Sequence, residues 1–264
     1  AVGFALFITA TAHTQAGWLS TAVTVPLFIS AVLLALFYRR SLTSLTPVIN
    51  VKIFRSSRFN SGAAAMVFIY FTVLGLGFLI PNYAQLVFGA DAFTAGCLLL
   101  PGCILGILVT PSAGRVLDCC GAALPVLGGS ILMLGSVLAM AWVTPDISNT
   151  LFAVLYTFFA FGQAASIPTV TLCAIRCLSA DYSASGNAVI NTLQPLSGAL
   201  GTSICASIVA AAQNASARAA GTQTGTAHAL VLLAAFTAVI LFCNLYLLNG
   251  KSHTVNTPNL SVQK

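Results

Sequence analysis

Three side-chain amides follow one another at helical spacing in the apolar segment 186–211. Asn187, Asn191 and Gln194 lie four and three residues apart, so a helix places them on one stripe. An amide buried against hydrocarbon is costly, so we expect this stripe to face protein or an aqueous cavity. Two interpretations remain open: the amides line a substrate cavity, or they form hydrogen bonds between helices. For Asn187, near the end of the segment, solvation at the membrane surface is a third.

The preceding apolar segment, 151–174, adds Gln163 and Thr169 to this candidate cavity. Other chemistry is poorly supported. The eight cysteines and three histidines show no spacing typical of a metal site, the chain has no Glu, and all four aspartates fall in predicted loops. The sequence therefore predicts no catalytic residue, metal or cofactor, disfavours an enzyme, and places no carboxylate at membrane depth.

The elements that must position these side chains are membrane-spanning helices. The chain is 58% hydrophobic and only 5% charged, which suits helices surrounded by a lipid bilayer. Hydrophobic stretches near twenty residues are long enough to cross its hydrocarbon core, whereas strands of a barrel would be about half as long and would alternate in polarity. We predict an all-α membrane protein. The predicted full spans are 19–38, 60–80, 94–113, 124–143, 151–174, 186–211 and 227–248.

The basic residues are distributed unevenly between the two predicted sides of the membrane. With seven spans, nine of the ten Lys and Arg residues share one side, and only Arg218 lies on the other. Basic residues near spans favour the cytoplasm, so we predict a cytoplasmic C-terminus and contact with anionic lipid rather than nucleic acid. The nine residues are Arg39, Arg40, Lys52, Arg55, Arg58, Arg115, Arg176, Lys251 and Lys264.

Four stretches of residues 17–205 carry motifs in a fixed order. They are Gly17-Trp18 with PVINVKIFR at 47–55 and Arg58-Phe59; Gln85, Gly89, Ala95-Gly96 and Pro101; Gly114-Arg115-Val116-Leu117-Asp118 closing at Gly121; and Asn191, Gly198 and Gly201. In order and spacing they resemble the major facilitator superfamily, specifically its fourteen-span drug:proton antiporter branch (the EmrB/QacA type). The chain departs from that pattern at Asn50, Cys119 and Gln194, where the family often has an acidic residue, a basic residue and Arg.

This resemblance implies a division of the chain. Residues 1–12 would be a partial transmembrane helix, 19–38 a linker span between bundles, and 39–59 a cytoplasmic basic loop. Residues 60–248 would form the C-terminal six-helix bundle, followed by a cytoplasmic tail at 249–264. The partner would be the N-terminal bundle of the same protein, because such transporters rock two bundles around a site at the membrane midplane.

The resemblance also implies a gating loop. It would comprise Gly114, Arg115, Asp118 and Gly121, and would stabilise one conformation through acidic–basic contacts and helix ends. The alternative is a solvated tight turn. A further set of small or helix-breaking residues in the spans would serve close helix packing or hinge motion. They are Pro101, Gly102, Gly106, Pro168, Pro195, Gly198 and Gly201.

The function implied is secondary active transport: proton-coupled efflux of amphipathic drugs or toxic compounds by alternating access, across a bacterial plasma membrane. Its partners would be a small amphipathic substrate and protons. Two alternatives stay open from the residues alone: a facilitator for a defined metabolite, such as an amino acid or siderophore, and a non-transporting fragment of such a protein.

Overall fold

The computed structural model describes residues 51–144, 147–215 and 217–249, together with Thr24, Val25, Phe28, Ile29 and Val32. The predicted partial helix 1–12 lies outside the described residues, as do most of the span 19–38, most of the loop 39–59 and nearly all of the tail 249–264.

The described residues form helices and no strands. Six of the resulting segments are long and apolar enough to cross a membrane, with α4 and α5 counted as one segment and η3 and α6 as another. This confirms the predicted all-α membrane class. The elements are η2 (Val51–Arg55), α3 (Ser57–Val87), α4 (Ala92–Cys97), α5 (Leu100–Cys120), η3 (Leu124–Gly128), α6 (Gly129–Val143), α7 (Asn149–Arg176), α8 (Ala180–Ala215) and α9 (Arg218–Leu248).

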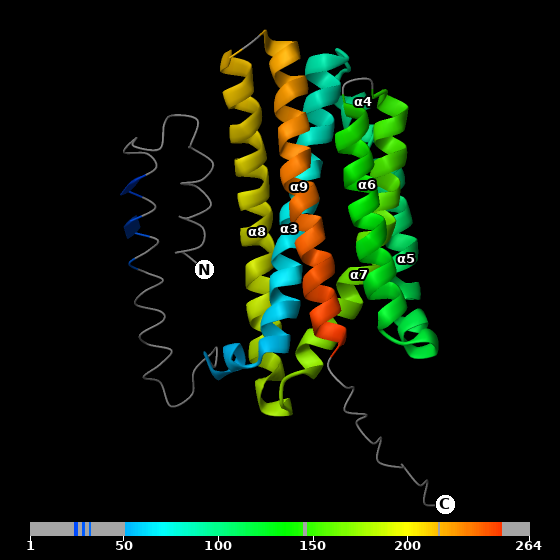
Figure 1. Ribbon diagram of the computed structural model, residues 1–264, viewed down its shortest axis with the longest axis vertical. Helices are drawn as coiled ribbons and strands as arrows, with labels where there is room; N and C mark the ends of the chain where they lie inside the picture. The colour runs from blue at the N-terminus through cyan, green and yellow to red at the C-terminus, as the bar shows by residue number, and fades with distance from the viewer. Residues whose placement is uncertain are drawn as a thin grey trace, which may run out of the picture.

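Successive long helices run in opposite directions, so the bundle has two distinct ends (Figure 1). The first residues of α3, α6 and α8 share the lower end in that view with the last residues of α5, α7 and α9. Arg55, Arg58, Arg115 and Arg176 all belong to this end, whereas Arg218 begins α9 at the other. Among the described arginines, the predicted grouping by side is therefore confirmed.

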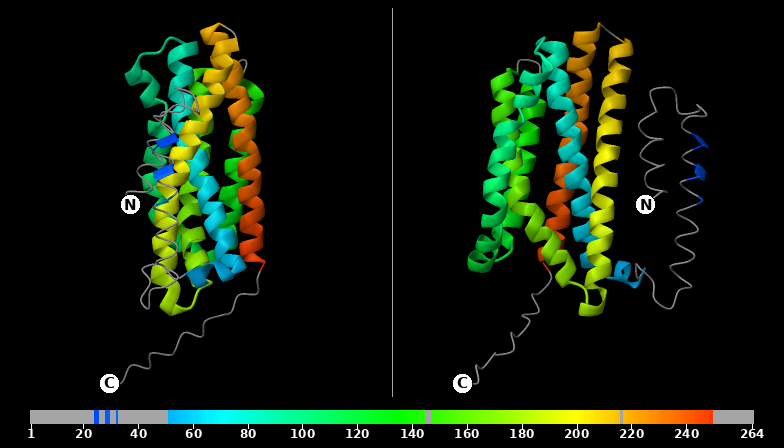
Figure 2. Two further views of the ribbon diagram at one scale, coloured as in Figure 1. Left: turned by 90° about the vertical axis from the view of Figure 1, so that its left-hand side faces the viewer. Right: turned by 180° about the vertical axis from the view of Figure 1, so that it is seen from behind.

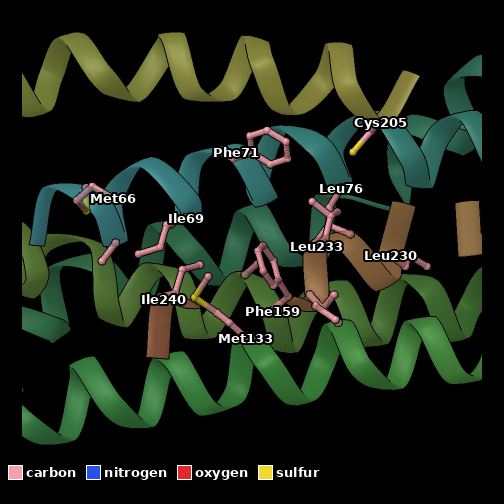
Figure 3. Packing of buried hydrophobic residues seen from close by; sticks show 14 of the residues in the cluster. Met66, Ile69, Phe71, Leu76, Met133, Phe159, Cys205, Leu230, Leu233 and Ile240 are labelled. Carbon is pink, nitrogen blue, oxygen red and sulfur yellow. The ribbon is translucent and has the colours of Figure 1, made fainter. Parts of the chain in front are cut away.

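Helix α3 organises the bundle. It packs against α8, α9 and α7, while α7 also packs against α5 and α6, as the two views of Figure 2 make visible. The core is apolar: Phe71 and Leu76 of α3, Leu233 of α9 and Cys205 of α8 are all buried in one cluster (Figure 3). Because lipid is as apolar as these side chains, the association of the helices depends on close van der Waals packing.

Glycine permits that packing where two helices touch. At Gly102 of α5, an added Cβ would lie 2.8 Å from the ring of Tyr156 and 2.9 Å from the methyl group of Ala160, both on α7. At Gly201 of α8, it would lie 2.9 Å from the carbonyl carbon of Phe71 on α3. These distances are shorter than any ordinary carbon–carbon contact, so only the missing side chain lets the helices approach so closely.

The helix ends differ from the predicted spans, and one difference is a correction. Gly114, Arg115 and Asp118 do not lie in a loop, because α5 continues as a helix to Cys120. None of the residues at 114–120 prevents a helix from continuing. Gly121 ends it with a φ of 78°, a backbone conformation that favours glycine. Only residues 121–123 separate α5 from η3.

Short polar side chains begin several helices. Ser56 caps α3 and Ser148 caps α7, each accepting a hydrogen bond of 3.3 Å from the backbone N–H three residues on. Asp91 caps α4, where its carboxylate accepts a hydrogen bond from the Thr94 N–H at 3.4 Å. Each cap satisfies one of the N–H groups that a helix start leaves unpaired.

The cap on α4 predicts that the stability of this helix depends on pH. Hydrogen bonding by Thr94 holds the pKa of Asp91 below its ordinary value. A carboxyl group with a depressed pKa stabilises the folded state above its unfolded pKa, and this stabilisation is lost as pH falls through the folded pKa. We expect Asp91→Ala to reduce the protection of residues 92–97 against hydrogen exchange at neutral pH, measured relative to the intrinsic exchange rate at each pH. The native chain should lose this protection on acidification, and the variant should show no such further loss. Asp91→Asn, which keeps a cap but cannot titrate, should exchange as slowly as the native chain at neutral pH. Equal exchange in all three proteins would contradict this role.

Tyr83 joins α3 to the end of α6 and to α7 at the upper end of the bundle. Its hydroxyl donates to the carbonyl of Thr144 at 2.9 Å, and its ring packs edge-on against Phe152 with centroids 5.2 Å apart. Tyr83→Phe keeps the ring and removes the hydrogen bond, so we expect a loss of about 1 kcal/mol and a fall of a few degrees in the thermal midpoint. Tyr70→Phe is the control, because the Tyr70 hydroxyl forms no hydrogen bond with the described part of the chain. Equal midpoints for the two variants would refute the assignment.

Candidate functional site

The amide stripe lies on the exposed side of α8. This helix is continuous from Ala180 to Ala215, so Asn187, Asn191 and Gln194 share one face. Asn187 and Asn191 are exposed and Gln194 is half-buried. The three amides form no hydrogen bond with any other residue that the structure describes.

The second half of α8, beyond the amides, packs closely on α3. Ser197, Gly198, Gly201 and Cys205 are buried there, with the two glycines against Leu74 and Phe71 of α3. Beside the amides themselves, in the first half of α8, Gly186, Val189 and Ile190 are buried while Asn187 and Asn191 are exposed, so there the amides point away from the bundle. This disfavours hydrogen bonding between helices of this bundle as the reason for the amides, and leaves them available to another surface or to a ligand.

Gln163 and Thr169 occupy a different helix. Gln163 of α7 is half-buried, and its buried side-chain oxygen accepts no hydrogen bond from the described residues. Thr169 is 1% exposed, and its hydroxyl donates to the Ala165 carbonyl of its own helix at 3.4 Å. Helices α7 and α8 each pack against α3 and touch one another little. The described helices therefore do not gather the five predicted cavity residues around one closed site.

The predicted gating residues lie at the lower end of α5. Gly114, Arg115 and Gly121 are exposed there, while the side chain of Asp118 lies outside the description. Asp118 follows Arg115 by three residues of the same helix, a spacing that places both on neighbouring positions of one face.

The predicted packing and hinge residues fall into two groups. Pro101 lies in the first turn of α5, where a missing N–H has no cost, whereas Pro168 and Pro195 interrupt the hydrogen bonding inside α7 and α8. An added Cβ at Gly106 would lie 4.0 Å from the methyl group of Ala164, an ordinary contact, unlike the close approaches at Gly102, Gly198 and Gly201.

A buried polar cluster escaped the sequence analysis. Ser130 of α6, Ser166 of α7 and Asn244 of α9 are all fully buried and meet at the π-helical turn η3. Asn244 alone gave a signal in the sequence, as an amide within an otherwise apolar span. The two serines are too common in membrane helices to stand out before the packing is known.

Two open grooves lie elsewhere on the described surface and contain none of the predicted site residues. The larger measures about 490 Å³ and is apolar, with Ile131 and Phe158 among its lining residues. Cys177, just beyond α7, is a poor nucleophile, because burial raises the pKa of its thiol despite the opposing effect of Arg58.

These features define the class of protein: it is a multi-pass helical membrane protein with an apolar core and polar side chains on selected helix faces. The chain belongs to the Major Facilitator Superfamily, whose family model matches residues 1–202.

Several bacterial relatives carry names of resistance proteins. The lincomycin resistance protein LmrB of Listeria monocytogenes is 28% identical over 247 residues, which cover 90% of this chain and 52% of the relative. LmrB of Bacillus subtilis is 31% identical over 198 residues, covering 75% of this chain and 41% of the relative. The multidrug resistance protein Stp of Mycobacterium tuberculosis is 27% identical over 198 residues, 75% of this chain and 36% of the relative. The chain spans about half the length of the first of these.

Proposed function

We propose that these helices are the C-terminal bundle of a bacterial drug efflux transporter in the plasma membrane, with the C-terminus in the cytoplasm. The similarity to LmrB and Stp over at least 75% of the chain carries this proposal. Because the chain spans about half of LmrB from Listeria monocytogenes, a second bundle of similar size would complete the transporter.

The order of motifs along the chain favours the fourteen-span drug:proton antiporter branch. In that arrangement the span 19–38 belongs to the linker between bundles, and residues 60–248 form the second bundle. The basic residues at the lower end of α3, α5 and α7 support a cytoplasmic position for that end, because cytoplasmic flanks of spans are enriched in Lys and Arg.

The exposed face of α8 is the proposed contribution of this bundle to the substrate path. Asn187, Asn191 and Gln194 offer donors and acceptors without fixed charge, which suits amphipathic compounds of varied structure. Lipid would leave these amides unsatisfied, whereas an aqueous cavity between two bundles would not.

Proton exchange would be the task of the first bundle. Asp118 and Asp181, the two acids of the described long helices, lie near helix ends rather than at membrane depth. A proton antiporter needs a titratable group at membrane depth, usually Asp or Glu. The proton-carrying residue would therefore lie in the partner bundle, and α8 would respond to it through the rocking of the two halves.

The test is the efflux of ethidium and of lincomycin from a pump-deficient bacterium that expresses the complete transporter. We expect cells to extrude ethidium and lincomycin against a gradient, and a protonophore to stop this extrusion. Retention of both compounds at the level of the empty vector would remove the efflux function. Extrusion that persists after the proton gradient has collapsed would remove proton coupling but leave transport in place.

A further inference from the structure

The lower end of α6 begins with a π-helical turn rather than an α-helical one. Residues Leu124–Gly128 form η3, which continues without a break into α6 at Gly129. The N–H of Gly129 is shared between the carbonyls of Pro125 and Val126. A π turn contains one residue more than the α turn that could replace it, and such turns are rare and frequently found at functional sites.

Hydroxyl groups from two helices bond the carbonyls of this turn. Ser130 of α6 donates to the Val126 carbonyl at 2.6 Å. Ser166 of α7 lies 3.2 Å from the Pro125 carbonyl and 3.4 Å from that of Val126, so its single proton is shared between them. The bonds from Ser166 come from another helix and hold these two carbonyls in place, which favours the π form.

Direct contact between two backbones allows Ser166 to reach the turn. An added Cβ at Gly129 would lie 2.5 Å from the carbonyl oxygen of Gly162, and one at Gly162 would lie 2.6 Å from the carbonyl oxygen of Gly129. Helices α6 and α7 therefore touch at this level. The placement of Ser166 on the turn is a consequence of the way the two helices pack.

A third helix enters through Asn244 of α9. Its side-chain nitrogen donates to the Ser130 hydroxyl at 2.8 Å, and the residue is fully buried. Its side-chain oxygen is buried and accepts no hydrogen bond from the part of the chain that the structure describes. A buried acceptor without a donor is costly, so its presence needs a reason.

We propose that η3 is a two-state element, held in its π form by Ser166 and by the Asn244–Ser130 pair, and that it converts to an α turn when these contacts loosen. In an α turn the Val126 carbonyl accepts the backbone N–H of Ser130. Ser166 of α7 then loses its two acceptors on the turn.

The conversion has a defined geometric result. When the turn becomes one residue shorter, the chain that precedes it rotates by about 100° relative to α6. That chain includes the short connection 121–123 and the lower end of α5 with Arg115. Helices α7 and α9 thereby control the orientation of the segment that joins α5 to α6. The conversion takes place within the bundle and does not depend on which compound is transported.

Distances between spin labels test the proposal. One label replaces Leu124, which is 61% exposed and lies in the turn, and the other replaces Leu172, which is 36% exposed and lies on α7. Both are attached to a ketone-bearing unnatural amino acid, so the native cysteines remain. A side chain about 5 to 6 Å from the helix axis moves by about 8 Å when it rotates by about 100°. We expect a second distance, displaced by about this amount, to become about fivefold more populated in Ser166→Ala and in Asn244→Leu than in the native complete transporter.

Three controls accompany the measurement. A label at Ile131, which is 59% exposed and lies beyond the turn, should keep its distance to Leu172 in every variant. Ser136→Ala removes a buried hydroxyl that donates to the Leu132 carbonyl at 2.7 Å within α6 alone, so it should leave both distances unchanged. Should Ser166→Ala fail to accumulate in the membrane, Ser130→Ala removes the other hydroxyl on the turn and carries the same expectation.

The result that overturns the proposal is also defined. The variants could lower the thermal midpoint while the distance from position 124 to position 172 keeps its native distribution. In that case η3 has one form, and the cluster only stabilises it. Because the measurement needs neither substrate nor a proton gradient, loss of the proposed efflux function would leave its outcome unaffected.

Discussion

Gly201→Ala is expected to destabilise the bundle strongly. The new methyl group would meet the backbone of Phe71, with the carbonyl carbon at 2.9 Å and Cα at 3.0 Å. Backbone atoms cannot rotate away as a side chain can, so α8 must move off α3. Overpacking of this kind costs about 1–3 kcal/mol. The measurements are the amount of complete protein in the membrane and its thermal midpoint in detergent, and Gly201→Leu should reduce both further.

Gly135→Ala is the matched control. Gly135 also lies within a long helix, α6, but an added Cβ there would meet nothing within 4 Å. Alanine has the better helix propensity, so this variant should be as stable as the native protein or slightly more so. Equal losses of stability at both positions would show that the contact between α8 and α3 is not what excludes a side chain at Gly201.

The second large effect is expected on transport. Replacing Asn187, Asn191 and Gln194 together with Leu removes every amide of the exposed stripe on α8. If these groups bind substrate in the complete transporter, each lost hydrogen bond weakens that binding by about 1 kcal/mol, and efflux should fall by about tenfold or more. Asn187 and Asn191 are exposed, and the stripe bonds no other described residue, so the thermal midpoint should change little.

Asn214→Leu provides the comparison for this variant. Asn214 is also an exposed amide of α8, but it lies near the opposite end of the helix and on a different face. Its replacement should leave efflux at the native rate. Native efflux in the triple variant would exclude the stripe from the substrate path. A fall in membrane abundance as large as the fall in efflux would instead assign the amides to assembly with the partner bundle.

Hydropathy predicted the six described spans because length and apolar composition are sufficient to identify a membrane helix. The ends were less accurate. Helix α9 begins at Arg218, nine residues before the predicted span 227–248, because its polar first turns continue the helix beyond the apolar stretch. Helix α5 likewise continues past the predicted end at 113. A polar residue ends an apolar segment without ending a helix.

The faces of the helices were harder to predict than their positions. In a soluble protein a polar stripe marks the outside, but these spans are apolar on the lipid side and on the packed side alike. Phe158 is 52% exposed and Phe159 is 0% exposed, although they are adjacent and identical in type. Small residues indicate the packed face of a helix better than polar residues do. At Gly201, for example, contact with another backbone requires glycine.

The candidate site was predicted in part. Spacing alone placed Asn187, Asn191 and Gln194 on one stripe, because helical geometry is local. The relation of that stripe to Gln163 depends on which helices are neighbours, and no local pattern encodes this. The π turn could not be predicted from the sequence either, because Ser166 and Asn244 reach it from helices that are distant in sequence.

The central place of α3 has a consequence for biosynthesis. Among the described helices it is the first to leave the ribosome, yet its partners α8 and α9 are made last, with α9 starting 131 residues after α3 ends (from Val87 to Arg218). At about 5–20 residues per second, α3 waits roughly ten seconds in the translocation machinery or the bilayer for its last neighbour. Nascent chains that stall before Arg218 therefore display an unfilled surface on α3, by which membrane proteases and insertion chaperones would distinguish them from finished molecules.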